Sequence, residues 1–114
     1  MQLSSHLLAK EQTIMTDTEQ IAALNQLASL LLKKVQNRDW DTLSAREREY
    51  VRYATLFSLR YLYEQSGTLT GQMIYTGLLR SNWDTLPKEE RGVYENAAAA
   101  MKEIIAQQRS GPLS

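Results

Sequence analysis

The residues that could perform acid–base, nucleophilic or metal chemistry are few and scattered along this chain of 114 residues. The chain has no cysteine, which excludes thiol catalysis and thiolate metal ligands, and its only histidine is His6, near the N-terminal end. The paired carboxylates Glu89-Glu90 open a predicted helix, where acidic residues favour the positive end of the dipole. The five glycines match no phosphate-binding loop. We therefore predict a protein that is not an enzyme, with no catalytic residue, no metal and no cofactor.

Tyrosine and arginine are the residues whose chemistry suits binding. Five of the six tyrosines fall between positions 50 and 75. Tyr and Arg are enriched at the centres of protein interfaces, and aromatic rings also stack on the bases of single-stranded nucleic acids. We expect most of these tyrosines to surround the core. The sequence nevertheless predicts an outer, partner-binding surface formed by Arg52, Tyr53, Arg60 and Tyr63.

Helices must position these side chains, because alternating strand patterns are absent. Two capping boxes, Thr16 with Glu19 and Ser44 with Glu47, mark two helix starts, Ser66-Gly67 ends the second helix, and Pro87 suits the first turn of another. The prediction is an all-α domain over residues 16–110, a bundle of about four helices, between a weakly ordered N-terminal arm (1–15) and a short tail (111–114). The helices are expected over about 17–37, 44–66, 70–82 and 87–109.

Apolar residues at three- and four-residue steps predict the buried side of these helices. The first helix has such a stripe from Ile21 to Val35. The second has apolar residues around most of its circumference, which is typical of a helix in the middle of a bundle or one that offers a second face to a partner. Its first stripe consists of Tyr50, Ala54, Phe57 and Tyr61, and further apolar residues (Val51, Tyr53, Leu56, Leu62 and Tyr63) widen it.

A tetrapeptide occurs twice, as Trp40-Asp41-Thr42-Leu43 and Trp83-Asp84-Thr85-Leu86. Each copy precedes a charged first helical turn. The interpretation we favour is a pair of analogous helix starts, in which the indole is a hydrophobic plug and the leucine packs back on the chain. The alternative is duplication of a helix pair, although similarity outside the tetrapeptide is slight.

The second copy begins a longer pattern. From Trp83, the sequence has Leu86, Arg91, Tyr94, Ala98, Lys102 and Ile105 at 3, 8, 11, 15, 19 and 22 residues, and Leu79 precedes it by four. This pattern over residues ~50–106 resembles the second half of a high-mobility-group (HMG) box. The resemblance implies three helices in an L shape, with Phe57, Trp83, Tyr94 and Lys102 packed at the elbow. The predicted structural core comprises Phe57, Leu79, Trp83, Leu86, Tyr94 and Ala98.

The charge of the chain argues against the DNA binding that this resemblance implies. HMG boxes are strongly basic, whereas residues 44–114 contain nine Lys+Arg and eight Asp+Glu, and the whole chain is neutral. Phosphate contacts supply most non-specific affinity for nucleic acid, so neutrality disfavours it.

The composition, 43% hydrophobic and 23% charged residues, is typical of neither a disordered nor a membrane protein. We expect a cytoplasmic regulator or adaptor that binds another protein or itself as a homodimer, without a membrane. The alternative is an HMG-box-like regulator that binds nucleic acid.

Overall fold

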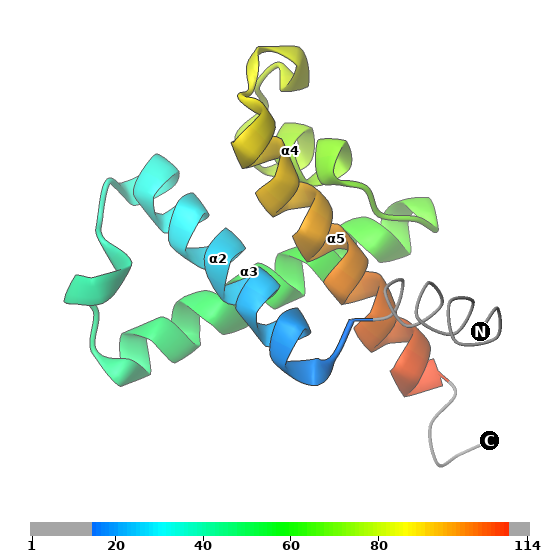
Figure 1. Ribbon diagram of the computed structural model, residues 1–114, viewed down its shortest axis with the longest axis horizontal. Coiled ribbons are helices and arrows are strands. Elements are labelled where there is room, and N and C mark those ends of the chain that lie inside the picture. The colour runs from blue at the N-terminus through cyan, green and yellow to red at the C-terminus, as the bar shows by residue number, and fades with distance from the viewer. Residues whose placement is uncertain (1–14, 110–114) are drawn as a thin grey trace, which may run out of the picture.

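The computed structural model describes residues 15–109, which contain four α-helices, two short 3-10 helices and no strand. The predicted all-α fold class is confirmed. The predicted arm and tail lie outside the described residues, except for Met15. In Figure 1, α2 packs against α5, α4 packs on α5, and α3 passes behind both α2 and α5. In chain order the elements are α2 (Asp17–Gln36), η1 (Trp40–Thr42), α3 (Ala45–Ser66), α4 (Gly71–Leu79), η2 (Trp83–Thr85) and α5 (Lys88–Arg109).

Side-chain caps set the first residues of α2 and α3. Both predicted capping boxes are present: the Thr16 hydroxyl accepts from the Glu19 N–H, and the Ser44 hydroxyl accepts from the Glu47 N–H, each at 3.1 Å. In each box the glutamate also accepts the N–H of the capping residue. These contacts satisfy amides that have no partner within the helix.

The third helix is shorter than the expected range of about 70–82. It ends at Leu79 because Arg80 adopts a left-handed conformation with φ of 53°. The Arg80 N–H donates to the Thr76 carbonyl, and the Asn82 side chain then caps the following 3-10 turn. Positive φ at a helix end is usually adopted by glycine and is uncommon for other residues. Because this position is Arg80, the sequence has no glycine that would indicate the end of the helix.

The two Trp-Asp-Thr-Leu segments fold in the same way. Each is one turn of 3-10 helix, with its threonine hydroxyl donating to the carbonyl of the residue before the tryptophan, at 2.7 Å in η1 and 2.8 Å in η2. The leucine N–H donates to the tryptophan carbonyl in both turns. Leu43 and Leu86 are both buried. The segments are therefore analogous helix starts in their local structure, as the favoured interpretation expected.

The core lies where α2, α4 and α5 meet the inner side of α3. Its largest fully buried side chains are Tyr94, Leu27, Leu59, Leu69 and Ile74. The alanine run of α5 supplies three more buried positions, and their small side chains allow close approach of the neighbouring helix. At the ends of the predicted α2 stripe the expectation was wrong, since both Ile21 and Val35 are exposed.

The residues predicted as structural core divide into three groups. Leu86, Tyr94 and Ala98 are buried, and Leu79 and Trp83 are partly buried against the core. Phe57 was wrongly assigned: its side chain is 67% exposed. The reason is that the opposite side of α3, which bears Leu59, already fills the space against the other helices.

Three aromatic rings form a cluster that includes Trp83 and Tyr94, two of the four residues that the HMG-box resemblance places at an elbow. The Trp83 ring meets the Tyr94 ring edge to face, with centroids 6.0 Å apart, and Tyr75 contacts both rings at 5.9 and 5.1 Å. Tyr75 of α4 therefore contributes the third ring, while Phe57 is exposed and Lys102 lies at the surface.

Candidate interaction surface

Aromatic side chains line the outer side of α3. Four of the six large hydrophobic residues that are exposed within residues 15–109 belong to this helix: Tyr50 is 75% exposed, Tyr53 70%, Phe57 67% and Tyr61 56%. Their three- and four-residue spacing places them on one helical face. We call these four residues the α3 aromatic face.

The other side of the same helix is buried and mostly aliphatic. Thr55 and Leu59 are buried, and Leu56 and Leu62 are partly buried against the core. The Thr55 hydroxyl donates to the Val51 carbonyl at 2.8 Å, which satisfies it within the helix. Helix α3 is therefore apolar on two sides, and the bundle covers only one of them.

Two neighbouring hollows border the α3 aromatic face. The first is lined by residues that include Val35, Tyr50 and Leu78, and the second by residues that include Phe57, Tyr61 and Leu78. Ser58 and Leu78 line both hollows. Tyr50, Phe57 and Tyr61 thus line two adjoining hollows between α3 and residues of α2 and α4.

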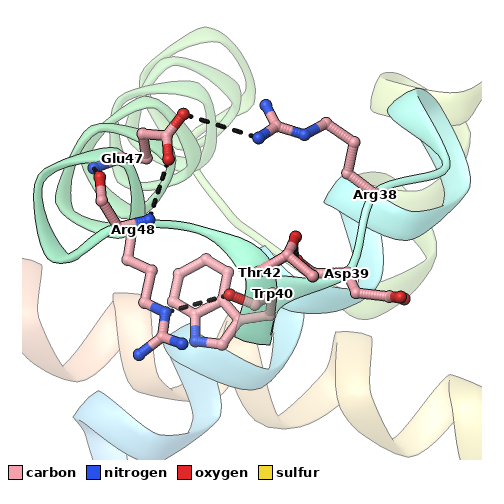
Figure 2. Close-up of polar contacts among 7 residues, drawn as sticks. Arg38, Asp39, Trp40, Thr42, Glu47 and Arg48 are labelled. Atoms are coloured by element: carbon pink, nitrogen blue, oxygen red, sulfur yellow. Dashed lines mark hydrogen bonds and ion pairs between the residues drawn. The ribbon is translucent and has the colours of Figure 1, made fainter.

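The turn before α3 holds the start of this helix in place (Figure 2). The Arg48 side chain reaches back to donate from Nε to the Trp40 carbonyl at 3.0 Å, and its guanidinium lies over the Trp40 ring, 5.9 Å from the centroid. On the other side of the turn, Arg38 is 3.6 Å from the Glu47 carboxylate. These contacts connect the end of α2 to the first turn of α3.

The four residues predicted to bind a partner are placed differently from one another. Tyr53 is exposed on the α3 aromatic face, and Arg60 is exposed beside it, with hydrogen bonds to Glu64 and Gln108. Arg52 donates to the Asn25 side chain on α2 and covers the Trp40 ring at 5.9 Å. Tyr63 is partly buried against the core.

Two of these assignments to an outer surface were therefore wrong. Arg52 and Tyr63 point toward the bundle, because the residues of α3 that share their side of the helix meet α2 and the core. Tyr50, Phe57 and Tyr61 were not included in the predicted surface. The sequence signal that could have identified them is the difference between the two sides of α3. One side has leucines and a threonine and packs on the core, and the other side is aromatic and exposed.

Titratable groups form contacts between elements of the bundle. Glu90 forms an ion pair with Lys34 at 3.2 Å, which joins α5 to α2. The backbone hydrogen bond from Ser44 lowers the pKa of Glu47, with smaller contributions from the Ser44 hydroxyl and Arg38. Burial raises the pKa of Tyr94, and the nearby Glu90 carboxylate adds to that rise.

No group of three or more potential metal ligands lies together within residues 15–109. His6, the one histidine, lies outside the described residues. Among the helices of that same region, none combines the length and hydropathy that crossing a bilayer requires.

Comparison of the chain with protein-family models, curated proteins and solved structures found no match.

Proposed function

We propose that this protein is a small, non-enzymatic regulator or adaptor in the cytoplasm, which acts by binding another protein chain through the α3 aromatic face. The observation that carries this proposal is the exposure of Tyr50, Tyr53, Phe57 and Tyr61, between 56 and 75%, on one side of one helix. Clustered exposed apolar surface is typical of interaction sites.

The chemistry of this surface favours a protein partner. Aromatic side chains supply large apolar area at the centre of interfaces, and Arg60 at the edge supplies a guanidinium that can form hydrogen bonds. The tyrosine hydroxyls of the exposed face keep it compatible with water when no partner is bound.

Nucleic-acid binding is the alternative, and it has two observations in its favour. Exposed rings such as Phe57 can stack on bases, and the contact between Trp83 and Tyr94 suits the HMG-box resemblance. Against it, the neutral chain provides no general attraction for phosphates.

A capture experiment tests the proposal. The purified chain and a Tyr53→Ala/Phe57→Ala variant are immobilised and exposed to nuclease-treated lysate of the source cell, with Ile21→Ala as the matched control because Ile21 is an exposed hydrophobic residue of α2. We expect specific protein capture by the original chain and the control, and its loss from the double variant. Equal capture by all three would contradict the proposal.

A gel-shift titration separates the alternative. A duplex DNA and a single-stranded DNA of mixed sequence serve as probes over a range of salt concentrations. Little or no shift is expected. Submicromolar binding with a steep salt dependence would favour the nucleic-acid function instead.

A further inference from the structure

We infer that the partner on the α3 aromatic face is a second copy of this chain, with the two α3 helices packed antiparallel about a two-fold axis. The inference rests on the proposed function, because it uses the same surface and specifies the partner that binds there. Three features of the molecule carry it: the area of the face, the order of residues along it, and the placement of its charges.

The area suits a dimer contact. An aromatic side chain contributes roughly 150–250 Å² when fully buried, so four rings with the observed exposure offer on the order of 500 Å². A typical stable interface buries about 800 Å² on each partner. Val35, which is 65% exposed beside Tyr50, and the aliphatic stems of the flanking arginines supply much of the remainder.

The order of residues along α3 is self-complementary. Arg46, Tyr50, Tyr53, Phe57, Arg60 and Glu64 follow one another at alternating steps of four and three residues, which is the spacing of a helix-pairing seam. These six positions are symmetrical about position 55: Tyr53 and Phe57 lie two residues on either side of it, and Arg46 and Glu64 lie nine.

A two-fold axis that crosses the outer side of α3 at the level of position 55 therefore pairs unlike residues. It places Tyr53 against Phe57 of the second copy, and Arg46 against Glu64 of the second copy at each end. Both contacts occur twice, as an isologous interface requires. Aromatic pairs and opposite charges in these positions are favourable.

The parallel arrangement opposes like charges. It would place Arg46 beside Arg46 of the second copy and Glu64 beside Glu64, and like-charge contacts at an interface are strongly unfavourable. The charges thus select the antiparallel arrangement. The zero net charge of the chain also means that two copies do not repel each other over long range.

The end residues are available for these contacts. Arg46 is exposed and has no ion pair or hydrogen bond of its side chain within residues 15–109. The Glu64 side chain is 58% exposed and forms one long ion pair, at 3.4 Å from Arg60 Nε on the same helix. Neither charge has to break a strong contact in order to meet a second copy.

Charge reversal tests the arrangement. Arg46→Glu and Glu64→Arg each place like charges at both ends of the proposed dimer, so we expect each variant to self-associate at least about tenfold more weakly than the original chain. Mixed in equal amounts, the two variants regain an opposite pair at both ends, and the mixture should recover dimer. Lys88→Glu, an exposed charge reversal on α5, is the matched control and should leave the dimer unchanged.

The readout is molar mass by light scattering, with circular dichroism to verify folding of each variant. The antiparallel pairing is supported if dimer is recovered in the mixture and is weakened in each variant by itself. Equal weakening of the mixture and of the single variants would overturn it. A monomer for the original chain, together with protein capture that Tyr53→Ala/Phe57→Ala abolishes, would overturn the dimer while the proposed function stands. A monomer without such capture would contradict both.

Discussion

The two groups of aromatic residues in this protein occupy opposite environments. Tyr75, Trp83 and Tyr94 form a cluster of edge-to-face rings, with Tyr94 fully buried. The α3 aromatic face presents equally large side chains to solvent. The first group connects α4 to α5, so it stabilises the fold. The second contributes little to the folded monomer, which is why we assign it to binding.

This difference shows that the type of an aromatic residue does not specify whether its side chain is buried or exposed. Both groups consist of Tyr with one other ring type, but the inner rings come from α4, η2 and α5, whereas the outer rings all lie on α3. The packing of the helices decides the role of each group: α4 and α5 bring the inner rings together, whereas α3 uses Leu59 and its neighbours to meet the bundle and leaves its aromatic stripe outside.

Removing a ring from the inner cluster should have the largest effect. Trp83→Ala is expected to lower the free energy of unfolding by about 3 kcal/mol, at the low end of core tryptophan truncations because Trp83 is only partly buried. Urea unfolding followed by circular dichroism measures this. A change within about 0.5 kcal/mol would mean that Trp83 is a surface contact.

The close approach of α4 to α5 beside this cluster gives the second prediction. A Cβ at Gly71 would lie 2.8 Å from the Glu95 backbone nitrogen, so Gly71→Ala should destabilise by about 1–3 kcal/mol through overpacking. Gly92→Ala is the matched control, because nothing lies within 4 Å of its Cβ position.

In the same urea experiment, Gly92→Ala should stabilise by about 0.5–1 kcal/mol, since alanine is the better helix former. If the two variants changed stability alike, the tight contact between α4 and α5 would not exist in solution.

The cap of α3 positions the outer face, and its loss should have a smaller effect. Ser44→Ala removes the hydroxyl that accepts from the Glu47 N–H and is expected to cost about 1 kcal/mol. An unchanged urea midpoint would contradict the observed capping box.

The same cap predicts a dependence on pH. The pKa of Glu47 is lowered in the folded state from its ordinary value of 4.5, so its stabilising contribution is present above that pH and is lost as the pH falls through the folded pKa. Glu47→Gln should therefore differ most from the original chain near neutral pH and converge with it in acid. A difference that grew in acid would contradict the sign of this shift.

On the outer face, truncation should leave the fold nearly unchanged. Phe57→Ala is expected to alter the unfolding free energy of the monomer by no more than about 0.5 kcal/mol, because the side chain is 67% exposed. The measurement is made at a protein concentration where the dimer is absent, since association itself adds stability. A loss comparable to that of Trp83→Ala would show that Phe57 is buried.

The sequence predicted the all-α fold well because its signals were local. Capping boxes and apolar spacing depend on residues three or four apart, and they are present at Thr16 and Ser44. The end of α4 was missed because Arg80 adopts positive φ without a glycine.

The candidate surface was harder to predict, since it depends on which side of α3 faces its neighbours. All four residues were predicted to lie outside; Tyr53 and Arg60 are exposed in the structure, whereas Arg52 and Tyr63 are partly buried against the bundle. A helix that is apolar around most of its circumference contains two plausible inner sides, and only packing against α2, α4 and α5 selects one.

The most direct test of the account is the mass of the original chain in solution beside that of Phe57→Ala. Sedimentation equilibrium up to about 100 μM is expected to give twice the 13.0 kDa chain mass for the original chain and for Ile21→Ala, and the monomer mass for Phe57→Ala. If the original chain stayed at 13.0 kDa over the whole range, the dimer through the α3 aromatic face would be contradicted.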